Sequence, residues 1–288
     1  MKHTFFSLPA KLHHWFEFTR FCFSEQSFQI REARQLTKLG MSVVHLLPES
    51  TRDDLKVIHF EPFLAHILGI YYSAVGHHDA VQTIALAGHG LDSLILLRPH
   101  LETLLVFLYV TEPQNELNEV FKRTDEYRDW VCVKMKQNMD RSRKLDLYRT
   151  IMDRDTFRDM VETNYAIIQG KYLDNKGALK RLEKLSSFIN NAERERIASK
   201  FNMADLYHYI FAESSASIHF ADIGDRMQET GDSKYRFPIR DKRGALWSVL
   251  VSNLLQIRCI RQFGEFFGLE SHLTPKLQRI FPSTLKGS

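Results

Sequence analysis

Apolar residues recur three and four positions apart along almost the whole chain, with polar residues between them. Short alternating runs of Val, Ile and Thr between Gly or Asn turns, which would indicate strands, are nearly absent. The pattern predicts an all-α fold, a multi-helix bundle formed by a single domain over residues 1–288. We predict helices over residues 11–23, 27–47, 53–75, 77–110, 116–139, 143–168, 176–190, 192–200, 203–222, 242–268 and 272–281.

Charge is spread unevenly over these helices. Residues 113–202 carry 19 Lys or Arg and 15 Asp or Glu, a much larger share than the 26% of charged residues in the whole chain. Helices of this composition keep one face in water, so we expect a charged helical arm over about 113–202. The segments at about 53–110 and 203–268 are more apolar and are expected to form the core bundle.

Composition narrows the class of protein only slightly. The net charge of +4 permits an anionic partner but does not mark a dedicated nucleic-acid-binding domain. The three cysteines are far apart and form no Cys-x-x-Cys pair, which argues against a zinc site or a disulfide framework. The longest apolar run, Leu101 to Val110, is shorter than the roughly 18 residues that a membrane span needs. It is interrupted by Glu102, and Arg98 lies three residues before it. We therefore expect a cytoplasmic protein without a membrane partner.

An Arg–Glu pair lies within the most apolar predicted helix, in the stretch "LLRPHLETLLVFLYV". Arg98 and Glu102 are four residues apart and therefore share one face of the helix. Charged residues are rarely buried unless they are paired, so these two side chains are expected to pair with each other or with other groups in the core. Pro99 lacks an N–H group and leaves the Ile95 carbonyl free to accept another bond.

A second polar group lies in "YHYIFAESSASIHFADIGDR", in the predicted helix 203–222. Ser215 and His219 are four residues apart on one face, and Asp222 follows three residues later. A histidine with such neighbours is able to act as a general base or acid. The alternative is structural: His219 simply bridges two helices by hydrogen bonds. We predict that Arg98, Glu102, Ser215 and His219 converge in one buried cluster, which is the candidate catalytic site.

These two motifs resemble a bacterial all-helical family, the domain of unknown function 5677. Its pattern of a small residue and Gly followed by Arg-x-x-x-Glu corresponds to "GHGLDSLILLRPHLETLLVFLYV" here, and its aromatic-x-x-x-Ser-x-x-x-His pattern corresponds to "FAESSASIH". The resemblance covers residues 60 to 220 approximately and implies an all-helical fold with a polar cluster. The family more often has Tyr where this chain has Phe211, which removes any role for a hydroxyl group at that position.

Such proteins also look like distant relatives of HEPN ribonucleases, which occur in bacterial toxin and phage-defence systems. Those enzymes cleave RNA without a metal, through an Arg-x(4–6)-His motif at a dimer interface. This sequence departs from that motif, because no Arg lies four to six residues before His219, so Arg98 would supply the charge from another helix. The resemblance implies RNA or another protein of a defence or toxin system as partner, a homodimer and no cofactor. The alternative is a non-enzymatic sensor, immunity or scaffold module in which the cluster is structural.

Two further patterns bear on binding chemistry. The "HHD" at residues 77–79 is similar to a metal-binding doublet, but Glu-x-x-His and the other ligands of such sites are missing, so we expect no metal. No Gly-rich phosphate loop or nucleophile motif is present either. The end of the loop 225–243 has four basic residues with aromatic residues among them, which would suit contacts to phosphates and bases, although a solvated connection is the simpler interpretation. The candidate phosphate contacts are Arg236, Arg240, Lys242 and Arg243.

Overall fold

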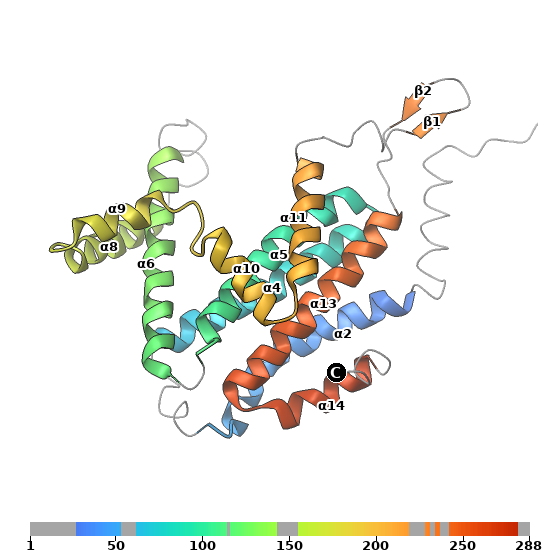
Figure 1. The fold of residues 1–288 in the computed structure, drawn as a ribbon, viewed down its shortest axis with the longest axis horizontal. Helices are drawn as coiled ribbons and strands as arrows, with labels where there is room; N and C mark the ends of the chain where they lie inside the picture. The colour runs from blue at the N-terminus through green and yellow to red at the C-terminus, as the bar shows by residue number, and fades with distance from the viewer. Residues whose placement is uncertain are drawn as a thin grey trace, which may run out of the picture.

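The computed structural model describes residues 27–52, 62–113, 116–142, 155–218, 228–230, 234–236 and 242–281. Within these ranges the chain is helical apart from one short hairpin, so the predicted all-α bundle is confirmed (Figure 1). The helices are α2 (Ser27–Ser42), the 3-10 helix η1 (Val43–Glu49), α4 (Pro62–Leu86), α5 (Gly90–Thr111), α6 (Leu117–Ser142), α8 (Asp155–Lys171), α9 (Lys176–Lys184), α10 (Asn191–Lys200), α11 (Ala204–Ile218), α13 (Lys242–Phe267) and α14 (Glu270–Ile280).

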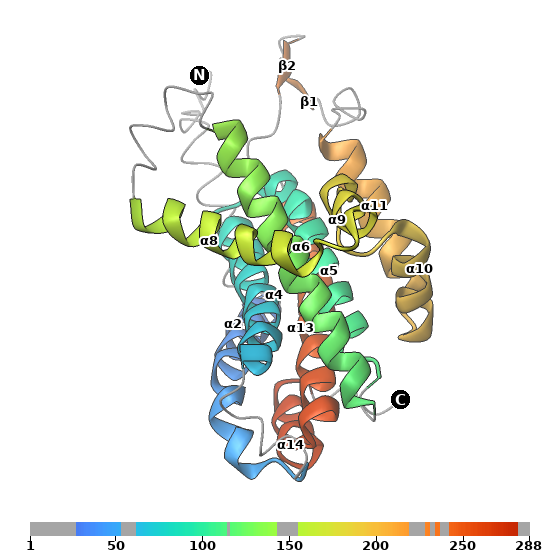
Figure 2. The same ribbon diagram turned by 90° about the vertical axis from the view of Figure 1, so that its left-hand side faces the viewer.

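Three long helices, α4, α5 and α13, pack against one another and form the centre of the bundle. α11 covers α5, while α2 and α14 pack against α13, as the two perpendicular views show (Figures 1 and 2). The main core also takes side chains from α2, α10 and α14, which lie outside the two ranges assigned to the bundle from the sequence. The bundle therefore uses segments from both ends of the described chain.

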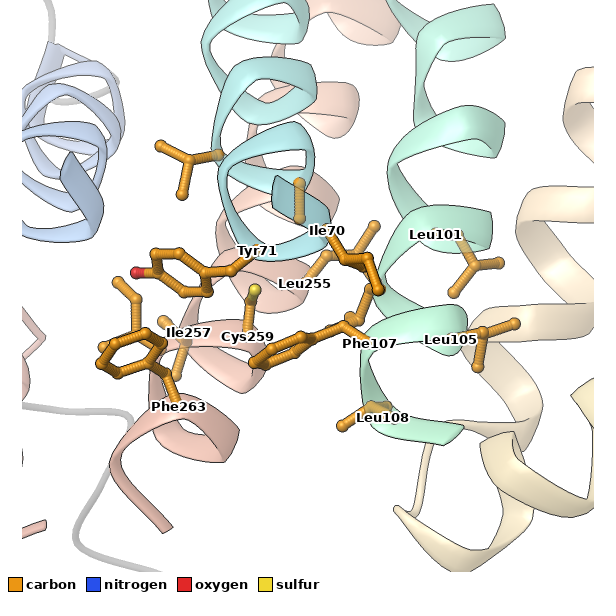
Figure 3. Close-up of a cluster of buried hydrophobic side chains, with 14 of the residues drawn as sticks. Ile70, Tyr71, Leu101, Leu105, Phe107, Leu108, Leu255, Ile257, Cys259 and Phe263 are labelled. Carbon is orange, nitrogen blue, oxygen red and sulfur yellow. The ribbon is translucent and has the colours of Figure 1, made fainter. Parts of the chain in front are cut away.

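Aromatic rings fill the contact between these three central helices (Figure 3). Tyr71 of α4 lies 4.6 Å from Phe263 of α13 and 5.7 Å from Phe107 of α5, measured between ring centroids. All three rings are fully buried, and each such side chain stabilises the fold by roughly 1.5–3 kcal/mol relative to exposure in water. Tyr71 also donates a hydrogen bond to the Gly40 carbonyl of α2, which satisfies its buried hydroxyl group.

The break between α4 and α5 differs from the prediction. The sequence suggested a boundary at residues 75–77, but α4 continues through the two histidines and ends at Leu86. Gly88 has a φ of +88°, and the backbone N–H groups of His89 and Gly88 donate to the carbonyls of Ile84 and Ala85. This left-handed glycine cap is the usual way to end a helix, and it outweighs the helix-start signal that we assigned to the histidines.

The loop predicted after α11 contains a small antiparallel hairpin. Strand β1 (Gln228–Thr230) pairs with β2 (Lys234–Arg236), with Glu229 opposite Tyr235. Four other predictions lie wholly or partly outside the described residues: the helix at 11–23, the first parts of the helices at 53–75 and 143–168, and the end of the helix at 203–222. α9 also ends earlier than predicted, at Lys184.

The charged segment divides into a projecting part and a part that returns to the core. α6, α8 and α9 stand to one side of the bundle in Figure 1 and in front of it in Figure 2, and we call these three helices the arm. Asp129 of α6 is fully buried and accepts hydrogen bonds from Lys171 and from the Tyr172 hydroxyl, which holds α8 against α6. α10 instead packs on α5 and α11, and its Ile197 and Ala198 belong to the core.

One carboxylate joins the arm to the core. Glu112, just after α5, accepts from Arg123 of α6 at 2.9 Å and from Arg196 and Lys200 of α10 at 2.7 and 2.8 Å. These hydrogen bonds, led by those from Arg196, hold the pKa of the Glu112 carboxyl well below its usual range. The Glu112 side chain is only 8% exposed, so the three cations are effective partners for it.

α5 spans 22 residues and is therefore shorter than the helix predicted over 77–110. By length and composition, this helix is able to cross a membrane, but 56% of its most apolar window is buried inside the fold. A central helix buried in a bundle has the same length and composition. The packing of α4, α11 and α13 against α5 accounts for the apolar character without a lipid contact.

Candidate functional site

The Arg98–Glu102 pair forms as predicted. Arg98 Nε donates to Glu102 Oε1 at 3.2 Å across one turn of α5. The two side chains are 35% and 34% exposed, so the expectation of a buried pair is wrong. The reason lies in the direction of this helical face, which points toward α10 and α11 at the edge of the bundle and not toward α4 and α13. A guanidinium in this position is accessible to a ligand.

A second arginine, which the sequence analysis did not single out, completes this group. Arg194 Nη1 lies 3.5 Å from Glu102 Oε1, and its side chain is only 7% exposed. The same nitrogen donates to Asn191 Oδ1 at 3.4 Å, while the buried Arg194 Nε has no hydrogen-bond partner among the described residues. Arg194 precedes the core residue Ile197 by three positions, so it shares the apolar face of α10, and that spacing was the available signal.

Phe211 of α11 lies beside both guanidinium groups. The Arg98 Cζ atom is 4.7 Å and the Arg194 Cζ atom 5.7 Å from the centroid of this ring. Such cation–π contacts hold the charged groups over an aromatic face. Tyr207 packs on the same ring, 4.7 Å between centroids, one turn earlier on α11. The ring at position 211 therefore works as a flat support for two cations, a role that needs no hydroxyl group.

The structure places the other predicted residues only in part. Ser215 lies on α11 one turn after Phe211, and α11 packs against α5. His219 lies outside the described residues. Among the candidate phosphate contacts, Arg236 is in β2, Lys242 and Arg243 begin α13, and Arg240 lies outside the described residues.

A separate polar cluster lies in the centre of the bundle, where the sequence analysis expected only core. His78 of α4, His100 of α5 and Ser252 of α13 are all fully buried. Ser252 Oγ is 2.8 Å from His78 Nδ1 and 3.1 Å from His100 Nδ1, so one hydroxyl group joins two imidazole rings. The three residues are far apart in the sequence, and only the packing of the three central helices brings them together.

The hydrogen bonds fix the tautomers of both rings. His78 Nε2 lies 3.3 Å from the Ala33 carbonyl, which only accepts, so this nitrogen carries the proton. His78 Nδ1 then accepts from the Ser252 hydroxyl, and His100 Nδ1 donates to the same oxygen. His100 Nε2 is left as a buried acceptor with no hydrogen-bond partner among the described residues.

Burial keeps both rings neutral. Loss of solvent lowers the pKa of His78 to about 3, against the smaller opposing effect of its hydrogen bonds. The pKa of His100 is also well below its usual range, mainly through burial and then through the neighbouring His78. Among the described residues, no group of three His, Cys, Asp or Glu side chains is arranged to hold a metal ion. This cluster therefore has the features of an internal hydrogen-bond network and not those of a solvent-accessible reaction centre.

The fold and the Arg98 group together define a class of protein: an all-α bundle in which an Arg-x-x-x-Glu helix faces an aromatic residue, Phe211, on a second helix. The chain matches the model of a family of unknown function, DUF5677, over residues 64–234, and it belongs to that family. The match runs from α4 to β2 and so includes Arg98, Glu102, Phe211 and Ser215. No curated protein and no solved structure gives a match to this chain.

Proposed function

We propose that the protein is a metal-independent ribonuclease of the HEPN-like type, with its catalytic centre at the contact between α5 and α11. The observation that carries this proposal is the position of Arg98. The Arg98 side chain is one-third exposed, and its Cζ atom lies 4.7 Å from the centroid of the Phe211 ring. Phe211 precedes Ser215 by one turn of α11. A fixed, solvent-accessible guanidinium is suited to bind a phosphodiester.

The proposed reaction is an attack of the RNA 2′-oxygen on the adjacent phosphorus. A bond forms between the 2′-oxygen and phosphorus, the bond to the 5′-oxygen breaks, and the products are a 2′,3′-cyclic phosphate and a 5′-hydroxyl end. His219 takes the proton of the 2′-hydroxyl group, and water returns a proton to the leaving oxygen. Arg98 stabilises the negative charge that develops on the phosphate, and Glu102 holds Arg98 in position.

Arg194 and the basic residues of the loop extend this proposal. Arg98 and the buried Arg194 share the single carboxylate of Glu102, so the second cation strengthens the positive potential near Arg98. Arg236, Arg240, Lys242 and Arg243 would contact neighbouring phosphates. In this proposal the partner is RNA, or a second protein of a toxin or phage-defence system, the chain acts in the cytoplasm as a homodimer, and no cofactor takes part.

One observation favours a second candidate, a non-enzymatic sensor, immunity or scaffold module. Glu102 bridges Arg98 of the central helix and the buried Arg194 of α10, which is an arrangement that fastens two elements together. In that case, the cluster is structural and the arm provides the interaction surface. The two candidates differ in what Arg98 does, because a structural role requires only its packing and charge.

The test is an RNA-cleavage assay of the purified protein with EDTA present, using a single-stranded RNA and its 2′-deoxy counterpart. We expect cleavage of the RNA alone and loss of at least about a hundredfold in rate for Arg98→Ala and His219→Ala. Arg279→Ala, at an exposed position on α14, is the matched control and should keep full activity. If the wild-type protein leaves the RNA intact, and its dimeric state has been confirmed, the ribonuclease is ruled out and the structural candidate remains.

A further inference from the structure

A cavity of about 530 Å³ lies where the arm meets the core. Tyr109 of α5 and Glu193 of α10 line it from the core, while Glu126 of α6 and Arg181 of α9 line it from the arm. Its volume lies in the range of roughly 300–1,000 Å³ that is typical of small-molecule sites. The cavity is separate from the Arg98 site, since Tyr109 lies two helical turns beyond Glu102 on α5.

The walls of the cavity combine aromatic rings with aliphatic side chains. Tyr109, Tyr172 and Phe188 provide the rings, and Leu182 and Leu185 provide the aliphatic surface. Two of these rings already contact positively charged side chains of the protein. The Arg123 Cζ atom lies 4.3 Å from the Tyr109 centroid, and the Lys171 Nζ atom lies 5.5 Å from the Tyr172 centroid. The aromatic surface here is thus one that attracts positive charge.

The carboxylates around the cavity also attract positive charge. Glu193 already pairs with Arg196 at 2.7 Å, but half-buried Glu126 forms no ion pair or hydrogen bond with any described residue. Burial is the main reason why the pKa values of Tyr109 and Tyr172 are raised, and the Glu126 carboxylate adds to the rise at both. Glu126 therefore lies near both rings, with its own charge not yet compensated.

We propose that this cavity binds a small organic cation, a primary ammonium or guanidinium group on a short aliphatic stem. The cationic group pairs with Glu126 between the two tyrosine rings, and the stem lies along Leu182 and Leu185. Arg181 is exposed at the arm side and leaves the region around Glu126 open to the ligand's charge. An anionic group is disfavoured beside Glu126, because no described residue pairs with that carboxylate.

Binding has a consequence for the arm. The ligand contacts α5 and α10 of the core together with α6 and α9 of the arm, so an occupied cavity holds these four helices in one arrangement. A ligand that binds only the folded state also stabilises the protein by mass action. We therefore expect reduced hydrogen exchange in α9 when the cavity is occupied.

The experiment is calorimetric titration of the full chain with putrescine and with agmatine. The matched neutral probe is 1,4-butanediol, which has the length of putrescine without its charges. We expect both cations to bind, the diol not to bind, and Glu126→Gln to weaken cation binding by about tenfold or more, the loss of a charged partner. Glu270→Gln makes the same charge change on α14, at a residue that does not line the cavity, and should bind like wild type.

Three results would overturn the proposal. The first is a wild-type chain that binds neither cation, and the second is a folded Glu126→Gln variant, with an unchanged melting temperature, that binds them as well as wild type. The third is binding of the anion adenosine monophosphate in place of the two amines. None of these outcomes depends on Arg98, so they do not test the proposed ribonuclease activity, which is tested separately by the RNA-cleavage assay.

Discussion

Replacing Ser252 by alanine removes one oxygen atom and leaves two buried imidazole rings without their shared partner. The Ser252 hydroxyl group donates to His78 Nδ1 at 2.8 Å and accepts from His100 Nδ1 at 3.1 Å, and all three residues are fully buried. A buried polar atom left without a hydrogen bond costs about 1–3 kcal/mol. Two ring nitrogens lose their partner here, so we expect Ser252→Ala to lower the free energy of unfolding by about 3 kcal/mol.

Urea denaturation at pH 7.5, followed by circular dichroism at 222 nm, measures this cost. The matched control is Ser214→Ala, which also removes a fully buried hydroxyl group from a long helix. The Ser214 hydroxyl donates only to the Ile210 carbonyl of its own helix, and that carbonyl keeps its main-chain bond, so the control should cost less than about 1 kcal/mol. Equal losses in the two variants would refute the reasoning that Ser252 is the common partner of both histidines.

Three other perturbations test the remaining electrostatic arguments. Folding lowers the pKa of both His78 and His100, so the unfolded chain binds more protons than the folded chain below pH 6.5. The free energy of unfolding should therefore fall by about 1.4 kcal/mol per pH unit for each ring as the pH decreases from 6.5 toward 4. A urea midpoint that does not change with pH over this range would contradict this prediction. Glu102→Ala should cost about 1–3 kcal/mol in a calorimetric melt, mostly because the buried Arg194 loses its carboxylate, and an unchanged melting temperature would show that Glu102 is dispensable. Asp129→Asn should detach α8 from α6, seen as faster hydrogen exchange in α8 with little change in α13, whereas equal acceleration in both helices would argue against a local anchor.

The sequence carried most of the information on the bundle itself. The helix predicted at 242–268 agrees closely with α13 at Lys242–Phe267. An apolar pattern runs through the whole helix, and Gly268, with a positive φ, follows its last residue. The boundary between α4 and α5 was missed because two signals competed. The histidines at 77 and 78 suggested a helix start, but Gly88 in a left-handed conformation decides where the chain turns.

The candidate sites show where local patterns stop being informative. Arg98 and Glu102 were found from their four-residue spacing, which is a property of one helix. Their exposure and their partner Arg194 depend on how α10 packs, and no spacing within α5 reports that. The cluster of His78, His100 and Ser252 was missed for the same reason, because each residue looks like an ordinary polar position until three helices meet.

α5, the described helix that is long and apolar enough to cross a membrane, is synthesised before two of the helices that cover it. α5 packs on α4, which precedes it, but also on α11 and α13, which leave the ribosome much later. Until α13 emerges, one side of α5 remains available to chaperones, to other nascent chains or to a lipid surface that its length and composition would fit. Completion of the bundle therefore has to follow translation of residue 267, and truncated chains that end before α13 are expected to aggregate.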